Sequence, residues 1–357
     1  MKSVKDGIIR ILLTMVLALL IGAIFIIAIG ENPITAYQAM LKGAFIGKLN
    51  FGTTLANFTP LLLTSTAFVV AAQAGAFNVG VEGEVFLGGI TAAYIGYQWT
   101  FLPKPLLMIA CFLGAIVVAG AWAFIPAFLK AYYNVSEVCV TILMNSVALY
   151  ITSFLVSGPM SAGSANPQSP DVAVWLPQFM RPSAVNVGLF LAIIVVLLII
   201  FMLYRTSMGF KFRLVGTNPR FGDFAGLDSK KVFIRAMMLS GMIGGFAGCI
   251  EVLGVHGYFL NNFATGLGSN GMLAALIVKS NVVATPFMAF FLAVLKSGAM
   301  GMQIATGVPK GLIDTITAVF ITIATMETLF DFLKREKKSA KTAAPTTPAS
   351  AGKEGQS

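Results

Sequence analysis

The chain has 357 residues, a net charge of +10 and 57% hydrophobic residues, while only 11% of its residues are charged. Soluble domains carry about 25% charged residues, so this composition excludes a soluble protein and predicts an integral membrane protein. The basic excess does not predict nucleic-acid binding, because basic residues collect in the cytoplasmic loops of membrane proteins.

Hydrophobic segments along the chain predict its membrane spans, since a helix needs about 20 apolar residues to cross a bilayer. The first segment, residues 8–29, is too long for the apolar part of a signal peptide and is expected to remain as a span. Residues 31–50 are mixed in polarity and are expected to lie outside the membrane. The other predicted spans are residues 53–74, 80–97, 105–129, 137–156, 187–204, 232–255, a short segment at 272–278, 284–302 and 312–330.

Basic residues predict the orientation of these spans. Lys2, Lys5 and Arg10 hold the N-terminus in the cytoplasm, and the lysines of residues 334–357 do the same for the C-terminus. Both termini on one side require an even number of crossings, so we expect about ten, with about eight as the alternative. The predicted fold is an all-α polytopic bundle with a single membrane domain, residues 1–333. Residues 334–357 are expected to form a disordered basic cytoplasmic tail.

Small residues in segment 232–255 predict close helix packing. Gly241-x-x-x-Gly245 and Gly244-x-x-x-Gly248 have the spacing that lets two helices approach each other closely. The three cysteines lie in apolar runs without metal-ligand spacing, and His256 is the only histidine. We therefore expect no metal site and no cofactor, and we expect His256 to have a hydrogen-bonded structural role.

A basic loop at residues 205–231 separates two predicted spans. It carries six lysines and arginines against two aspartates, which places it in the cytoplasm. Asn218 followed by Pro219 predicts a helix start, with a capping side chain and a proline at the first helical position. Phe221 and Phe224 follow at near-helical spacing. We expect a short amphipathic surface helix with an aromatic face, and the alternative is an ordinary basic loop on anionic lipid.

Polar residues inside the hydrophobic segments are candidates for a solute path. Residues 75–84 combine three glycines with Asn78 and Glu82 between two apolar runs. Irregular backbone at membrane depth survives only where protein or water surrounds it. This stretch is therefore either a broken helix that lines a translocation path or a tight cytoplasmic turn with solvated glutamates. Glu251 lies within a span, where an ionisable side chain normally faces the bundle interior, and it either touches the solute or caps a helix contact. Asn145 either forms hydrogen bonds with a hydroxyl-rich solute or bridges two helices.

Four segments resemble importer-type ATP-binding-cassette (ABC) permeases of the ribose and nucleoside branch. GAFNVGVEGEVFLGG matches a glycine-rich permease pattern at Asn78, Gly80, Glu82, Gly83 and Gly88. The segment that begins at Trp122 matches at Pro126, Lys130, Asn134, Glu137, Thr141 and Asn145. The basic loop matches at Gly216, Asn218, Pro219 and Gly226 and departs at Asp223, Phe224 and Leu227. GLGSNGMLAALIVKSN is similar to a fourth pattern and departs from it at Met272 and at Lys279, where glycine is common.

This resemblance implies the permease subunit of a bacterial ABC importer for nucleosides or a related simple sugar, in the cytoplasmic membrane. The implied mechanism is alternating access, in which a separate cytoplasmic ATPase binds the basic loop. A second permease, identical or related, would complete the pore, and an extracytoplasmic binding lipoprotein would deliver the solute. The residues implied in coupling are Gly216, Asn218, Pro219, Phe221, Phe224 and Gly226. Those implied in the path are Asn78, Glu82, Asn145 and Glu251.

Two other classes of protein remain as alternatives. The chain has no Walker A motif, so ATP hydrolysis would need another subunit and no catalytic residue is assigned. A secondary transporter would use carboxylates such as Glu82 and Glu251 for proton coupling, and an uncoupler would then abolish uptake while ATP persists. A membrane-embedded enzyme would need a polar catalytic cluster, which one histidine and scattered acids do not supply.

Overall fold

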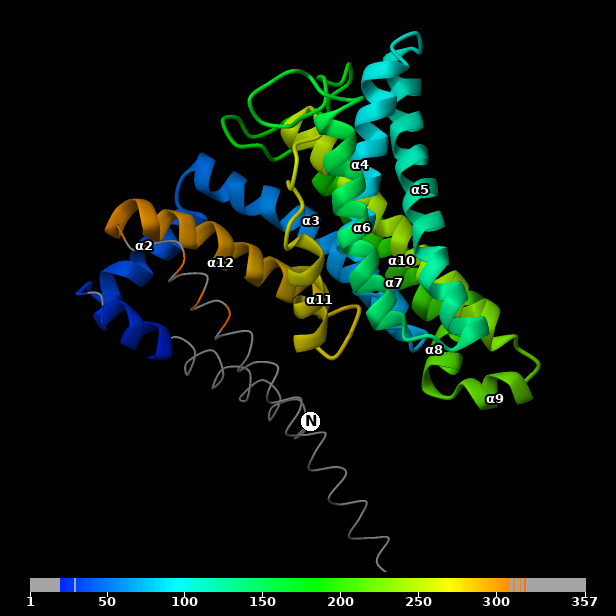
Figure 1. Ribbon diagram of the computed structural model, residues 1–357. Coiled ribbons are helices and arrows are strands. Elements are labelled where there is room, and N and C mark those ends of the chain that lie inside the picture. The colour runs from blue at the N-terminus through cyan, green and yellow to red at the C-terminus, as the bar shows by residue number, and fades with distance from the viewer. Residues whose placement is uncertain (1–19, 29, 308–310, 312–314, 316–317, 319–357) are drawn as a thin grey trace, which may run out of the picture.

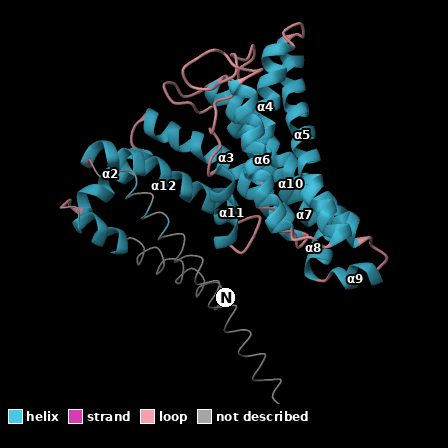
Figure 2. Cartoon of the chain, viewed as in Figure 1, coloured by secondary structure: helices cyan, strands magenta, loops and turns pink. Residues whose placement is uncertain are grey.

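The computed structural model describes residues 20–28, 30–307 and positions 311, 315 and 318. Throughout these residues the regular elements are helices (Figure 2), apart from two isolated β-bridges, Gln168↔Leu260 and Gln178↔Asn186. This confirms the predicted all-α class. The predicted span at 312–330 and the predicted tail at 334–357 lie outside the described residues, except for positions 315 and 318, and so does most of the span at 8–29.

The described helices match the predicted spans to within a few residues at each end, and they add two helices that were not predicted, α2 and α8. After a helix at Leu20–Ala28, they are α2 (Pro33–Phe45), α3 (Lys48–Gln73), α4 (Val81–Gln98), α5 (Lys104–Tyr133), α6 (Glu137–Ser157), α7 (Gly188–Arg205), α8 (Ser207–Thr217), α9 (Pro219–Phe224), α10 (Ser229–Glu251), the π-helix η1 (Val252–His256), α11 (Leu267–Ile277) and α12 (Thr285–Thr306).

The helices form two groups that α3 connects (Figure 1). In the larger group α10 packs against α4 and α5, and α6 packs against α4. In the smaller group α12 packs against α2 and α11. Helix α3 contacts α12 and α11 of the smaller group and α10 and α7 of the larger group. Because α3 packs against both groups, a shift of α3 would displace helices in both of them.

The larger group has two distinct ends (Figure 1). One end, which we call the α9 end, carries α8, α9 and the turn at residues 74–80. The other, which we call the loop end, carries the irregular segment 158–187. This segment is fixed to the bundle by backbone hydrogen bonds, from Leu176 N to Leu253 O at 2.8 Å and from Ala173 N to Gly96 O at 3.0 Å. Helices α4, α6 and α10 run from the α9 end to the loop end.

Residues 31–50, which the sequence left without a span, are largely helical. Asn32 caps α2, because its side-chain oxygen accepts a hydrogen bond from Ile34 N at 2.9 Å and Pro33 occupies the first turn. Close packing then fixes α2 on α12: a Cβ atom on Gly43 would lie 2.5 Å from the Cα of Gly301. Short stretches of small residues, rather than a long apolar run, make this contact.

Six of the described helices are long and apolar enough to span a membrane, and the bent pair Leu20–Ala28 with α2 would make a seventh. The six are α3, α5, α6, α7, the continuous rod Ser229–His256 and α12. Helix α4 is less apolar because Glu82 and Glu84 lie in its first turn, and it packs among α5, α6 and α10. The polar groups of such a helix are stable in the membrane because protein, rather than lipid, surrounds them.

The two glycine pairs of α10 face two different neighbours, which confirms the predicted close packing. Gly241 and Gly245 lie against α5, where a Cβ atom on Gly241 would approach the Ala119 carbonyl to 2.7 Å. Gly244 and Gly248 lie against α4, and a Cβ atom on Gly248 would overlap the Val85 carbonyl. Because the obstacle at Gly248 is backbone, it cannot rotate away.

Gly248→Ala is therefore expected to lower the free energy of unfolding by about 1–3 kcal/mol, the usual cost of an added methyl group in a packed core. Thermal unfolding of the purified protein in detergent measures this loss. Gly311→Ala is the matched control, because no described residue lies within 4 Å of a Cβ atom at that position. Equal melting temperatures for Gly248→Ala and the wild type would show that α4 and α10 are not packed in this way.

Candidate functional site

Helix α9 begins where the sequence predicted a helix start. The side-chain oxygen of Asn218 accepts a hydrogen bond from Phe221 N at 3.1 Å, and Pro219 is the first helical residue. Helix α8 precedes it and was not predicted. Its Thr206 cap accepts a hydrogen bond from Gly209 N at 3.3 Å, and its buried face consists of Phe212 and Val215. The loop is thus two short helices rather than one.

The start of α10 holds α9 in place. The Ser229 hydroxyl donates to the Pro219 carbonyl at 2.8 Å, and Ser229 N donates to the carboxylate of Asp223 at 3.1 Å. Gly222 is buried between Val215 and Ser229, and Gly226 has a φ of +78°, which suits glycine at the turn that follows. Both ends of α9 are therefore tied to neighbouring helices, so a force on α9 is passed to α8 and α10.

The aromatic residues of α9 point away from the protein. Phe224 is 90% exposed and Phe221 is 56% exposed, and α9 projects from the end of the bundle (Figure 1). Exposed phenylalanines on this short helix of the basic loop contribute little burial of apolar surface to the fold itself. Paired apolar side chains of this kind mark contact sites for another molecule.

Gly216 brings the end of α8 against the end of α3. A Cβ atom on Gly216 would overlap the Gln73 carbonyl and would lie 2.9 Å from Gly75 N. Gly75 itself has a φ of +75°, and its own Cβ position is 3.3 Å from the Cα of Gly216. Two glycines are thus required for this backbone contact. It joins the α8–α9 unit to the turn that leads from α3 into α4.

That turn is organised by the buried side chain of Asn78. Its oxygen accepts a hydrogen bond from Gly80 N at 2.9 Å, while its nitrogen donates to the Glu84 carboxylate and to the Ser240 hydroxyl, each at 2.9 Å. Glu84 is 1% exposed, so it is not the solvated glutamate of a surface turn. The second oxygen of the Glu84 carboxylate is buried and finds no hydrogen-bond partner among the described residues. Asn78 thus joins α4 to α10.

Asn145 fixes the same turn from the other side. Its nitrogen donates to the Val79 carbonyl at 2.9 Å, and its oxygen accepts from Gly83 N at 2.8 Å. Since Gly83 N is at the start of α4, where backbone donors lack helical partners, Asn145 acts as a cap from another helix. The side chains of Asn78 and Asn145 therefore form their hydrogen bonds within the protein.

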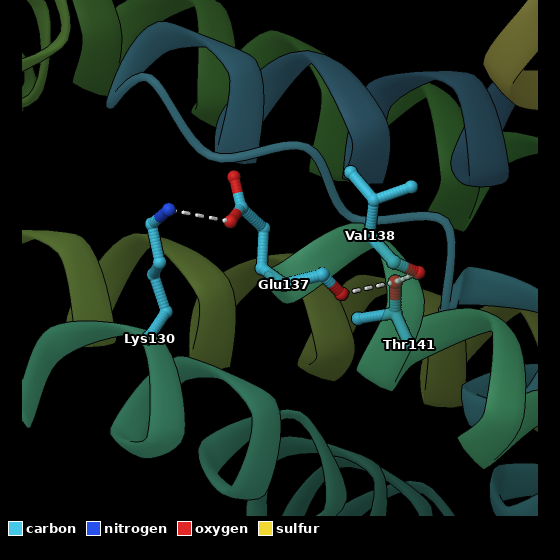
Figure 3. A network of polar contacts seen from close by, with 4 residues as sticks. All are labelled: Lys130, Glu137, Val138 and Thr141. Carbon is cyan, nitrogen blue, oxygen red and sulfur yellow. Dashed lines mark hydrogen bonds and ion pairs between the residues drawn. The ribbon is translucent and has the colours of Figure 1, made fainter. Parts of the chain in front are cut away.

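An ion pair connects the end of α5 to the start of α6, next to this turn (Figure 3). Lys130 Nζ lies 3.1 Å from a carboxylate oxygen of Glu137, while the Thr141 hydroxyl donates to the Glu137 carbonyl at 2.7 Å. The Cβ of Thr141 would lie 3.2 Å from a Cβ atom on Gly80. The two segments that resemble permease patterns, residues 75–88 and 126–145, are therefore packed on each other.

Glu82 lies on the side of α4 that faces α11. One of its carboxylate oxygens accepts a hydrogen bond from the Ser269 hydroxyl at 3.2 Å. A Cβ atom on Gly268 would lie 2.5 Å from Glu82 N. Helix α11 has 11 residues and is about 16 Å long, which makes it shorter than a full membrane span and fits the short segment predicted there. Its N-terminus, with its partial positive charge, begins beside this carboxylate.

Glu251 lies apart from the other predicted path residues. It ends α10, 11 residues or about 16 Å beyond the Ser240 that contacts Asn78. Its carboxylate is 4.0 Å from His256 Nε2. The structure thus brings Asn78, Glu82 and Asn145 to the first turn of α4 and places Glu251 near the loop end. Among the described residues, no cluster of three or more histidines, cysteines or carboxylates could hold a metal ion.

Comparison with known proteins gives the chain a family context. The profile of the family described as "Branched-chain amino acid transport system / permease component" matches residues 50–326. The chain is 31% identical to the guanosine ABC transporter permease protein NupP of Bacillus subtilis, over 92% of this chain and 97% of that protein. It is 27% identical to the nucleoside ABC transporter permease protein NupB of Lactococcus lactis, over 94% and 95%. It is 30% identical to the glucose ABC transporter permease protein TsgB13 of Haloferax volcanii, over 87% and 84%. No solved structure matches the chain at a significant level.

Proposed function

The chain belongs to this family of transport-system permease components and is the membrane subunit of an ABC importer, and we propose that its solute is a nucleoside. Similarity to NupP and NupB over nearly the whole chain carries this proposal. A simple sugar is the second candidate, because TsgB13 is almost as similar. The relatives give no support to a proton-coupled secondary transporter.

The two ends of the bundle support the orientation and the partners that we propose. The α9 end carries the basic loop and faces the cytoplasm, and the loop end faces the exterior, where a binding lipoprotein delivers the solute. Both termini are cytoplasmic, with about ten crossings in the bacterial cytoplasmic membrane. The ATPase is a separate cytoplasmic chain. A second permease completes the pore. This is supported by the likeness of the chain to a second permease from each of the same organisms, NupQ of Bacillus subtilis and NupC of Lactococcus lactis, each 26% identical over 63% of this chain.

Helix α9 is the part that the ATPase moves. Phe221 and Phe224 enter a groove of the ATPase, while Asn218, Pro219 and Gly226 set the ends of the helix. When the ATPase subunits close on ATP, α9 moves with them. The contact between Gly216 and Gln73 then shifts the end of α3 and the buried turn of Asn78, which changes the side on which the bundle is open.

Glu82 is the path residue with the best placement for contact with a solute. Glu82 is half-buried, and Ser269 is the hydrogen-bond partner of its carboxylate among the described residues, whereas the side chains of Asn78 and Asn145 each form several hydrogen bonds within the protein. A carboxylate can accept hydrogen bonds from the hydroxyls of a ribose or another sugar. Asn78 and Asn145 serve the path by fixing the turn that carries Glu82, and Glu251 contributes near the loop end.

Glu82→Ala is expected to lower uptake about tenfold or more, since hydrogen bonds to a charged group are worth about 1.5–3 kcal/mol. Copurification of the ATPase should not change, because the contacts described for Glu82 are with Ser269 and Gly268 of α11, away from the proposed ATPase contact at α9. Glu31→Ala, at an exposed glutamate, is the control. Unchanged uptake kinetics in Glu82→Ala would remove this residue from the path.

The solute is tested by uptake into proteoliposomes that contain the permease pair and the ATPase, with the binding protein and labelled solutes outside. ATP-dependent accumulation of nucleosides, with competition by unlabelled nucleosides and not by glucose or pentoses, supports the proposal. Accumulation of a sugar alone would assign the chain to the second candidate. Uptake that collapses with an uncoupler while ATP persists would contradict both.

A further inference from the structure

Gln73, the last residue of α3, lies where three segments from distant parts of the sequence meet. Its side-chain nitrogen donates to the Ser280 carbonyl, in the turn between α11 and α12, at 3.0 Å. Its own backbone carbonyl is covered by Gly216 of α8. One residue therefore contacts the unit that carries α9 and also the turn that begins the smaller helix group.

The turn that accepts this hydrogen bond has a fixed shape. Lys279 and Ser280 both adopt left-handed backbone conformations, with φ of +56° and +54°. Such a conformation costs a residue other than glycine roughly 1 kcal/mol or more, which is the physical reason that glycine suits position 279. Backbone hydrogen bonds hold the turn, from Lys279 N to Leu276 O at 2.9 Å and from Ser280 N to Ala275 O at 2.8 Å.

The same turn leads directly into α12. The side-chain oxygen of Asn281 accepts hydrogen bonds from Val283 N at 3.0 Å and Ala284 N at 3.2 Å, just before the helix begins. Helix α12 packs in turn against α2, α3 and α11. The Ser280 carbonyl therefore belongs to a turn that is fixed to the smaller helix group, and the Gln73 side chain donates a hydrogen bond to this carbonyl.

We propose that Gln73 is the positioning residue that makes the two helix groups respond together when the ATPase moves α9. This rests on the proposed coupling function of α9. Movement of α8 reaches the end of α3 through Gly216, and the Gln73 side chain passes it to α11 and α12. Without that hydrogen bond, ATP hydrolysis still moves α9 and the larger group, while the smaller group follows incompletely.

A purely structural role for Gln73 makes a different prediction. A hydrogen bond at a helix end that only supports the fold would, when removed, lower the amount of folded protein, and uptake and ATP hydrolysis would fall together. A positioning residue instead changes the ratio between them. The number of solute molecules imported per ATP hydrolysed therefore separates the two roles.

The test compares Gln73→Glu with Gln73→Lys in proteoliposomes that contain the permease, the ATPase and the binding protein. Glutamate has no donor for the Ser280 carbonyl, whereas lysine is long enough and retains one. We expect Gln73→Glu to lower uptake per ATP about five- to tenfold, the size of one lost hydrogen bond, and Gln73→Lys to retain most of it. Gln303→Glu, at an exposed position of α12, is the control.

An unchanged ratio in Gln73→Glu would overturn the proposal, and so would equal losses in the glutamate and lysine variants. A parallel fall in uptake, hydrolysis and protein amount would show a structural role only and would also overturn it. Failure of the proposed function is distinguishable, because the wild-type permease would then bind no ATPase and no ratio would exist.

Discussion

Phe224→Asp is expected to abolish uptake while the protein remains folded in the membrane. Phe224 is 90% exposed, so its loss costs the fold almost nothing. An aromatic residue at the centre of an interface, in contrast, is typically worth about 2–4 kcal/mol of binding free energy. The affinity for the ATPase should therefore fall roughly 30- to 1000-fold. Copurification of the ATPase with the tagged permease measures this loss directly, and uptake measures its consequence.

Phe101→Asp provides the matched control for this experiment. Phe101 is 78% exposed and lies between α4 and α5, away from α9, so its replacement should leave ATPase binding intact. A Phe224→Asp permease that still copurifies the ATPase and transports normally would show that α9 is not the coupling element. The double variant with Phe221→Asp would add little, because one buried charge already disrupts the contact.

Asn78→Ala is expected to destabilise the protein by about 3 kcal/mol. Asn78 is fully buried and supplies three hydrogen bonds, and each buried polar group left without a partner costs about 1–3 kcal/mol. Glu84 would then have no partner for either carboxylate oxygen. Thermal unfolding in detergent measures the loss of stability, and the amount of protein in the membrane should fall in parallel.

Asn166→Ala is the control for this change, because Asn166 lies exposed in segment 158–187 and the hydrogen bond described for it, from the Ser164 hydroxyl, goes to its backbone carbonyl. The outcome separates two roles for Asn78. Loss of stability identifies it as the residue that joins α4 to α10. Normal stability with a specific loss of uptake would instead place its side chain in contact with the solute, contrary to the structure.

The sequence predicted the parts of the fold that depend on neighbouring residues. Long apolar runs located α5, α6 and α7, and the Asn218–Pro219 pair located the start of α9. The glycine pairs of α10 were correctly expected at close helix contacts. Each of these signals lies within about 20 residues, and each has a local physical cause: hydrophobic length, a helix cap or the absence of a side chain.

Helices α2 and α8 were missed because neither has the length or the hydrophobicity of a span. Helix α8 is an 11-residue helix in a basic loop, and its buried residues, such as Phe212, are too few to form a recognisable pattern. The cap at Thr206 was the available signal.

The site could be predicted only in outline. The glycine-rich stretch drew attention to Asn78 and Glu82, but nothing local distinguishes a buried turn from a solvated one. The partners that decide the matter are distant in sequence: Ser240 is 162 residues from Asn78, and Ser280 is 207 residues from Gln73. The roles of Ser240 and Gln73 therefore required the folded structure.

The most direct test of the account is uptake by the purified permease in proteoliposomes, with and without its ATPase. With the ATPase, the binding protein and ATP present, we expect solute to accumulate against its gradient, and we expect accumulation to stop when the ATPase is omitted or α9 carries Phe224→Asp. Accumulation by the permease alone, driven by an ion gradient, would contradict the conclusion that α9 connects this bundle to an external motor.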